Sequence, residues 1–300
     1  MINTIRIQNF RCFEDFQYNG FERVNLIGGK NNSGKTCLLE ALACLSEKFT
    51  HDDVSALRNE KQHFLVNKNA KSNLLKVIVE FNTGVHQFVL VLNELKQITS
   101  LQNRAGLNVT IITQKNELPV IDILKSFDEF DAKLIKDQLI DILKIIDPRI
   151  EDMRTFKTKE GLHIKCENDE YKPLSHYGDA TKNLIRYFTP IFEKELTINK
   201  GNSLSILLID EIENGLHYTS HYEFWKNVFL LSDKLNVQIF ATTHSLEMIK
   251  AFNQVALKNK TGAYFEMGID ADTGKVFAEK HDSALLNSEL LNPHSTLRGE

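Results

Sequence analysis

The stretch Gly29-Lys30-Asn31-Asn32-Ser33-Gly34-Lys35-Thr36 decides the fold class of this chain. It matches the pattern G-x-x-x-x-G-K-[ST] of a phosphate-binding loop at every fixed position. An apolar run typical of a strand, Val24–Ile27, leads into it, and leucines and alanines at helical spacing follow from Cys37 to Lys48. Because a phosphate-binding loop lies between a strand and a helix, this context predicts a nucleotide site rather than a chance glycine turn.

The residue types of this loop indicate its chemistry. Glycine lets backbone N–H groups turn toward phosphate oxygens, and the start of a helix favours anions. Lys35 is predicted to reach the β- and γ-phosphates as a catalytic residue, and the Thr36 hydroxyl is predicted to bind Mg²⁺. We therefore expect ATP and Mg²⁺ here, with the nucleotide contacted by Gly29, Asn31, Asn32, Ser33, Gly34, Lys35, Thr36 and Cys37.

A second signal is the acidic pair Asp210-Glu211, which follows the apolar run Ser205–Ile209. Such a run is typical of a strand buried on both faces, so the pair should lie at the edge of the sheet where open α/β folds bind ligands. We predict that Asp210 holds the Mg²⁺ hydration shell and that Glu211 orients and polarises the attacking water. Alone, the pair could simply mark a strand that meets solvent. The phosphate loop upstream favours the functional interpretation.

A third signal is His244 in Thr242-Thr243-His244-Ser245, which ends another apolar run, Val237–Thr242. A lone histidine is usually an ordinary polar residue with satisfied hydrogen bonds. Its position one helix and one strand after the acidic pair favours a different role. We predict that His244 is a catalytic residue that hydrogen-bonds the γ-phosphate and senses its loss.

The remaining pattern predicts an α/β protein with a mainly parallel core sheet, an antiparallel β layer and a helical lobe. Strands are expected at 4–10, in a hairpin of 75–81 and 87–92, near 109–113, and at 263–269 and 275–279. Helices are expected between 119 and 150, and over 218–235 and 246–252. We expect one domain over residues 1–300, with a core lobe at about 1–115 and 201–300 and a helical lobe at about 116–200.

Composition limits the partners and the compartment. The net charge is −4 and no basic run occurs, which disfavours constitutive tight DNA binding. No apolar run reaches the roughly 18 to 20 residues that span a bilayer, and the N-terminus lacks the pattern of a secretory signal. The four cysteines, Cys12, Cys37, Cys44 and Cys166, are scattered, which fits a reducing compartment. We expect a cytoplasmic protein that does not bind membranes.

The motifs together resemble a known family. The phosphate loop, Leu208–His217 and Ala241–Ser245 occur in the order found in ABC-type ATPases of the RecF, SMC and OLD branch. Ile7–Phe13 is similar to the first strand of that branch, and Leu291–Arg298 resembles the end of its compact members. The resemblance therefore spans nearly the whole chain. It implies a P-loop NTPase of the ABC-ATPase head type.

The resemblance also implies a signature that contacts the γ-phosphate of ATP held by another subunit. Leu174–Lys182 matches its place, and Ser175, Gly178 and Asp179 fit the form Ser-x-x-Gly-Asp-Gly-x-Lys. Ala180 replaces the second glycine, which implies a looser or slower site. Ser175 is expected to cap a helix that begins near Gly178, although a plain helix cap is the alternative reading of this segment.

Other family features fit less closely. In the family the segment matching Asn214–His217 crosses a dimer interface, and Tyr218 stands where the family usually has proline. Gln87 and Gln114 are the candidates for the glutamine of the lid loop, and either could be a surface residue.

The function implied is that of an ATP-dependent dimerising switch, in which two subunits enclose two ATP molecules. Compact members resemble the ATPase halves of bacterial anti-phage or toxin systems. No long heptad region separates the phosphate loop from the signature, and we expect no fused nuclease (TOPRIM) domain. We therefore expect a separate effector protein, a nuclease or a toxin, as partner. Two alternatives stay open: a RecF-like repair clamp with DNA as its partner, and a nucleotide-dependent scaffold with negligible turnover. A transporter motor subunit is disfavoured by the motif sequences.

Overall fold

A computed structural model describes residues 1–45, 74–81, 84–92, 98–102, 108–112, 147–156, 159–197 and 205–290, with single positions between 137 and 144. The predicted helical region at 119–150 lies almost wholly outside the described residues, as do Gln114 and Leu291–Arg298. The chain forms two compact units. The first unit is Met1–Lys115, Ser203–Asn214 and Ser232–Glu300, and the second unit is Asn116–Asn202 and Gly215–Leu231.

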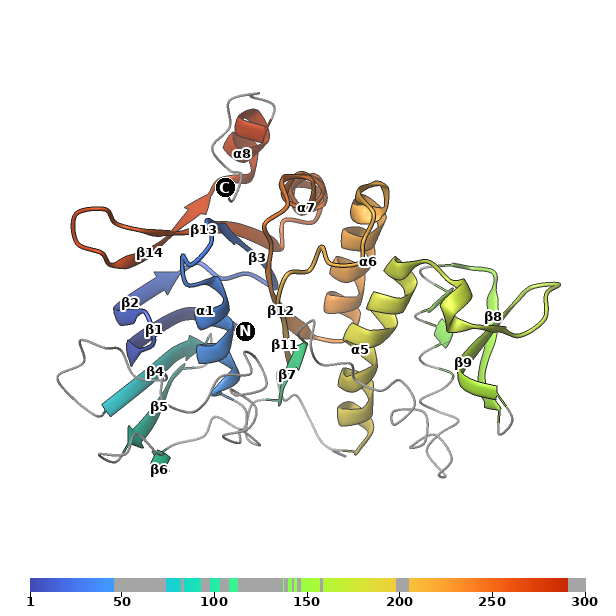
Figure 1. The fold of residues 1–300 in the computed structure, drawn as a ribbon, viewed down its shortest axis with the longest axis horizontal. Coiled ribbons are helices and arrows are strands. Elements are labelled where there is room, and N and C mark those ends of the chain that lie inside the picture. The colour runs from blue at the N-terminus through green and yellow to red at the C-terminus, as the bar shows by residue number, and fades with distance from the viewer. Residues whose placement is uncertain are drawn as a thin grey trace. The chain divides into compact units, whose positions relative to one another are not determined.

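The first unit contains a six-stranded sheet in the order β14-β13-β3-β12-β11-β7, shown in Figure 1. Its strands are β3 (Val24–Gly29), β7 (Asn108–Ile112), β11 (Ser205–Ile209), β12 (Val237–Thr242), β13 (Gly262–Ile269) and β14 (Val276–His281). All neighbouring pairs are parallel except β13 with β14. Every residue of β3, β11 and β12 is buried, as expected for apolar strands covered on both faces. The predicted parallel core sheet is therefore confirmed.

A second sheet of the first unit is antiparallel, in the order β2-β1-β4-β5-β6. Its strands are β1 (Ile2–Phe10), β2 (Phe13–Asn19), β4 (Leu74–Phe81), β5 (Gly84–Leu92) and β6 (Ile98–Gln102). The β4–β5 hairpin agrees with the alternation of its sequence. β7 was predicted as a strand near this hairpin, but it pairs in parallel with β11 in the core sheet instead. The predicted antiparallel β layer is confirmed.

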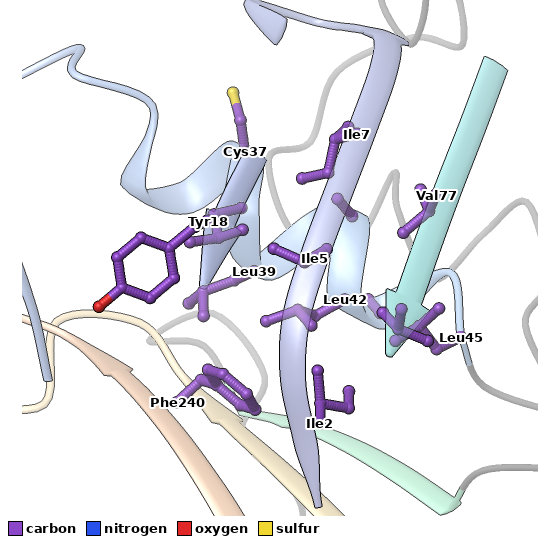
Figure 2. Packing of buried hydrophobic residues seen from close by; sticks show 14 of the residues in the cluster. Ile2, Ile5, Ile7, Tyr18, Cys37, Leu39, Leu42, Leu45, Val77 and Phe240 are labelled. Carbon is purple, nitrogen blue, oxygen red and sulfur yellow. The ribbon is translucent and has the colours of Figure 1, made fainter. Parts of the chain in front are cut away.

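Helix α1 (Lys35–Ala43) lies in the core between these two sheets. Figure 2 shows Leu39 and Leu42 of α1 near Ile5 of β1, with Phe240 of β12 nearby. These four side chains are at most 1% exposed, and burial of each aliphatic or aromatic side chain stabilises the fold by about 1.5–3 kcal/mol. The helix that follows the phosphate loop is thus held by apolar contacts with both sheets.

Two further helices belong to the first unit. Helix α7 (Leu246–Asn259) begins after Ser245, whose hydroxyl accepts a hydrogen bond from the Met248 N–H at 3.2 Å, an N-cap contact. It is longer than the predicted 246–252. Helix α8 (Ser283–Leu290) follows β14 and buries Leu286 and Leu290.

The second unit contains an antiparallel sheet that was not predicted from the sequence, in the order β10-β9-β8. Its strands are β8 (Ile150–Phe156), β9 (Lys159–Cys166) and β10 (Lys172–Pro173). Two register shifts in the β8–β9 pair interrupt the polar–apolar alternation, which explains the weak strand signal. After this sheet come a 3-10 turn, η3 (Leu174–His176), and helix α5 (Asp179–Thr197). A second 3-10 turn, η4 (Tyr218–Ser220), leads into helix α6 (His221–Lys234). Most residues of α6 belong to the second unit.

Candidate nucleotide-binding site

Three sequence motifs that are far apart along the chain lie together at one edge of the core sheet. Strand β12 lies between β3 and β11, with Thr242 opposite Ile27 and Ala241 opposite Ile209. Because the three strands are parallel, their carboxyl ends lie together. Those ends carry the phosphate loop after β3, the acidic pair after β11 and the His244 turn after β12. This is the edge at which open α/β sheets bind ligands.

The phosphate loop needs glycine at two positions. Gly29 has φ +124°, and a Cβ there would lie 2.2 Å from the carbonyl oxygen of Met267. Gly34 has φ +99° and precedes α1, where its carbonyl accepts the N–H of Leu38 at 2.9 Å. Both are backbone conformations that residues with a side chain rarely adopt. The loop therefore leaves backbone N–H groups at the start of α1 free of a side-chain cap, as phosphate binding requires.

Lys35 is held inside the loop. Its side chain is 5% exposed, and Nζ donates hydrogen bonds to the carbonyl oxygens of Gly29 at 2.7 Å and Lys30 at 2.8 Å. Burial lowers the pKa of Lys35 to about 8, and the charges of Asp210, Glu213 and Glu211 offset part of that shift. A phosphate group would add negative charge beside this ammonium and favour its protonated form.

Thr36 and Asp210 supply oxygen atoms at one point. The Thr36 hydroxyl lies 3.3 Å from Oδ2 and 3.5 Å from Oδ1 of Asp210. Mg²⁺ prefers oxygen ligands and is commonly bound by one or two protein groups together with substrate phosphates and water. The hydroxyl and carboxylate therefore fit a magnesium site beside the loop.

Thr242 connects the acidic pair to β12, a role that the sequence pattern did not predict. Its buried hydroxyl donates to Asp210 Oδ1 at 2.6 Å and accepts the N–H of Glu211 at 2.8 Å. Glu211 has φ +52°, unusual for a residue other than glycine, and its Oε2 accepts a hydrogen bond from Asn214 Nδ2 at 2.9 Å. Strain of this kind is often found at functional sites. The hydrogen bonds of Glu211 with Thr242 and Asn214 support the turn at this residue.

Three buried polar atoms at this edge of the sheet lack hydrogen-bond partners among the described residues, and a bound nucleotide could supply them. Ser33 Oγ, Glu213 Oε2 and His244 Nδ1 are buried and make no hydrogen bond within the part of the chain that the structure describes. Each such atom costs about 1–3 kcal/mol when it is unsatisfied. All three belong to the segments that converge here. A polyanion with its hydration shell provides both acceptors and donors, so these residues fit a bound nucleotide.

The other predicted loop residues differ in exposure. Asn31 and Asn32 are exposed, and Asn32 has φ +62°. The Cys37 side chain is 7% exposed and belongs to the hydrophobic core. Only the backbone of Cys37 is therefore on the side of a ligand at the start of α1.

The predicted signature lies in the second unit, around the start of α5. Helix α5 begins at Asp179, and the Gly178 carbonyl accepts the N–H of Lys182 at 3.2 Å. Gly178 thus takes the N-cap position that was expected for Ser175, which is exposed in the turn η3. Asp179 Oδ1 accepts from Lys182 Nζ at 2.9 Å, and the Ala180 side chain is partly buried.

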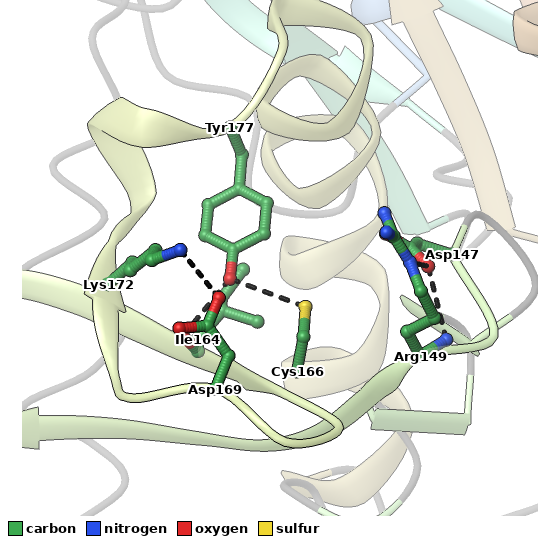
Figure 3. Close-up of polar contacts among 7 residues, drawn as sticks. All are labelled: Asp147, Arg149, Ile164, Cys166, Asp169, Lys172 and Tyr177. Carbon is green, nitrogen blue, oxygen red and sulfur yellow. Dashed lines mark hydrogen bonds and ion pairs between the residues drawn. The ribbon is translucent and has the colours of Figure 1, made fainter.

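Tyr177 anchors this segment to the sheet of the second unit, as Figure 3 shows. Its hydroxyl donates to the Ile164 carbonyl at 3.1 Å and lies 3.6 Å from Cys166 Sγ. Burial and the hydrogen bond to Cys166 raise the pKa of Tyr177, which keeps the phenol protonated. The bonds fix the turn that leads into α5.

The segment after the acidic pair also lies in the second unit from Gly215 onward. Gly215 has φ +73°, and His217 Nδ1 lies 2.9 Å from the Thr219 hydroxyl. The ring of Tyr218 lies 4.5 Å from that of His217 and is 65% exposed. The candidate lid residue Gln87 is on β5 opposite Ile78, and its side chain is outside the described set.

The P-loop between β3 and α1, joined by acidic and histidine-bearing turns on neighbouring parallel strands, defines a P-loop ATPase. The chain belongs to the AAA ATPase domain family, which matches residues 1–120 and 91–249. Within that class it is an ATPase of the ABC, RecF and SMC type. The resemblance seen in the motifs is therefore confirmed.

Relatives and solved structures agree with this assignment. An ATP/GTP phosphatase of Helicobacter pylori is 23% identical, over 85% of this chain and 88% of that protein. The DNA replication and repair protein RecF of Bacillus cytotoxicus is 27% identical over 64% of this chain and 51% of its own length. The SMC head domain of Thermotoga maritima has a TM-score of 0.59 at 13% identity, covering 94% of this chain and 99% of that one. An SMC head bound to the C-terminal winged-helix domain of ScpA has a TM-score of 0.62 at 11% identity, covering 95% and 99%.

None of the described helices has the length and apolar character needed to cross a membrane.

Proposed function

We propose that this protein binds ATP with Mg²⁺ and hydrolyses it at the edge formed by β3, β12 and β11. The observation that carries the proposal is the convergence there of Lys35, the Thr36–Asp210 oxygen pair and Glu211. In phosphoryl transfer the protein mainly positions the reactants and neutralises charge, and these residue types meet both needs.

The proposed reaction is phosphoryl transfer to water. The water oxygen forms a bond to the γ-phosphorus, the bond from that phosphorus to the β,γ-bridging oxygen breaks, and ADP and phosphate leave. Glu211 orients the water and accepts its proton. Lys35 and the loop N–H groups stabilise charge on the phosphate oxygens, and His244 hydrogen-bonds the γ-phosphate. Mg²⁺, held by Thr36 and Asp210, would neutralise phosphate charge when bound.

The proposed cycle requires two chains. The signature residues Ser175, Gly178 and Asp179 would contact the γ-phosphate held by a second copy, so that ATP joins two chains and hydrolysis releases them. The exposed turn at Gly178 and the exposed Tyr218 support an interface there. Ala180 in place of glycine implies a looser or slower site.

Two substitutions test this cycle. Lys35→Ala removes the buried ammonium, and we expect it to lose ATP binding by isothermal titration calorimetry. Glu211→Gln keeps the binding groups, so we expect it to bind ATP and to accumulate a dimer, seen as doubled mass by light scattering. A Glu211→Gln protein that stays monomeric with saturating ATP, at concentrations where it binds, would contradict the dimer.

The biological role proposed is that of a cytoplasmic ATPase that controls a separate effector protein, as in bacterial anti-phage or toxin systems. The sequence resemblance to compact ATPases of such systems supports it. The similarity to RecF supports the alternative of a DNA clamp.

Purification of tagged Glu211→Gln protein from its native host in the presence of ATP separates these roles. Recovery of a stoichiometric nuclease- or toxin-like protein is the expected result. Recovery of nuclease-sensitive DNA without a protein partner would replace the effector role with the clamp.

A further inference from the structure

Glu213 has a different environment from the acidic pair before it. Its Oε1 accepts the backbone N–H of His244 at 2.6 Å, and the two residues belong to the turns that follow β11 and β12. Its Oε2 is buried and makes no hydrogen bond within the described chain. An Asp-Glu pair at the end of a strand gives no reason to expect that the glutamate two positions later also points into the sheet edge.

This hydrogen bond continues the contacts between β11 and β12 beyond the strands. The Glu211 N–H is bound by the Thr242 hydroxyl, and the Ile212 N–H by the Thr242 carbonyl at 3.0 Å. The His244 N–H then points back to Glu213. On its other side the turn is tied to β3, because the Thr243 N–H donates to the Ile27 carbonyl at 3.0 Å. Without Glu213, the backbone at His244 has no bond to the acidic turn in the described structure.

We infer that Glu213 is a positioning residue for hydrolysis, which fixes the backbone at His244 so that the His244 ring meets the γ-phosphate. The inference rests on the proposed ATPase function. Hydrogen bonds to a charged acceptor are short and strong, which suits this 2.6 Å contact. Glu213 acts through His244, not through the attacking water, and this separates its role from that of Glu211.

Two substitutions distinguish the contribution of the Glu213 hydrogen-bond acceptor from that of its negative charge. Glu213→Gln keeps an oxygen that accepts the His244 N–H, whereas Glu213→Ala removes it. Glu279 is exposed on β14, so Glu279→Gln and Glu279→Ala are matched controls for the same changes away from the site. Hydrogen exchange at the amide of His244, followed by mass spectrometry of peptides spanning 240–248, measures whether the hydrogen bond from His244 to Glu213 is present. This measurement does not require ATP turnover.

We expect Glu213→Ala to lower kcat by about 10- to 100-fold, while the Kd for ATP changes by less than about threefold. Glu213→Gln should stay within about threefold of the wild-type kcat, since it restores the acceptor. Exchange at 240–248 should accelerate in Glu213→Ala and stay slow in Glu213→Gln and in both controls.

Two outcomes would overturn the inference: a Glu213→Ala protein with wild-type kcat and exchange, or a Glu213→Gln protein as impaired as Glu213→Ala. A wild-type protein without ATP turnover would instead remove the proposed function. In that case the exchange comparison still tests whether Glu213 holds the His244 turn.

Discussion

At the residue scale, Thr242 organises the site although it has no chemical role of its own. One hydroxyl orients the Asp210 carboxylate and supports the N–H of Glu211, whose backbone is in the left-handed region. A buried hydroxyl that both donates and accepts keeps two neighbouring residues in fixed relative positions. The spacing between the Asp210 carboxylate, proposed to hold Mg²⁺, and the Glu211 carboxylate, proposed to orient water, therefore depends on this side chain.

Thr242→Val replaces the hydroxyl with a methyl group of similar size. The Glu211 N–H then loses its acceptor and Asp210 loses a donor, so we expect a destabilisation of about 1–3 kcal/mol. We also expect kcat to fall by about tenfold or more. Urea unfolding and steady-state ATPase assays measure the two effects. Thr242→Ser keeps the hydroxyl and is the control; a valine variant with wild-type turnover would show that the contact is dispensable.

The candidate site was partly predictable from single residues. Lys35, Thr36, Asp210, Glu211 and His244 were identified because each stands at a fixed place relative to an apolar strand or glycine loop. The structure places all five at one edge of the core sheet, although their roles stay predictions. Thr242 and Glu213 were not assigned, because their partners lie about 30 residues away and depend on the parallel register of β11 and β12.

At the element scale, His281 links three elements of the first unit. Its Nε2 lies 3.6 Å from Glu266 on β13 and its Nδ1 lies 3.4 Å from Glu289 on α8. The hydrogen bond and charge of Glu266, with the charge of Glu289, raise the pKa of His281 above its ordinary value despite burial. When it is protonated, the ring pairs with carboxylates on β13 and α8 and so holds α8 beside the closing strands.

This arrangement predicts a pH-dependent stability. Because the folded-state pKa exceeds the unfolded value of about 6.5, the stabilisation is fully present below that pH and is lost as pH rises through the folded-state pKa. Relative to His281→Asn, the wild type should be more stable by up to about 1 kcal/mol at acidic pH, since Glu289 is half exposed. Urea unfolding of both proteins from pH 5.5 to 9 tests this; a difference that grows with pH would contradict it.

Elements with a continuous or regular pattern were the predictable ones. The runs that form β3, β11 and β12 are mainly apolar and fully buried, and the β4–β5 pair alternates around a glycine turn. The β8–β9 pair was missed because its bulges disturb the alternation. The strand β7 was predicted from the sequence, but its place in the core sheet was not. That place depends on the long-range pairing of β7 with β11, which the local sequence does not encode.

At the scale of the whole molecule, the proposed hydrolysis residues and the predicted signature belong to different units of the chain. The phosphate loop, Asp210, Glu211 and His244 lie in the first unit, and the signature residues lie in the second. The proposed cycle completes each site with the signature of a second copy. Its chemical step nevertheless depends on the first unit, so the assignment of Glu211 is the central claim.

The most direct test is a single-turnover assay with γ-labelled ATP and Mg²⁺, comparing wild-type and Glu211→Gln proteins at concentrations that saturate binding. The Glu211→Gln side chain cannot accept the proton of the attacking water, so we predict phosphate release slower than wild type by about 100-fold or more, at equal ATP occupancy. Phosphate release at the wild-type rate by Glu211→Gln would contradict the assignment of this residue and the mechanism built on it.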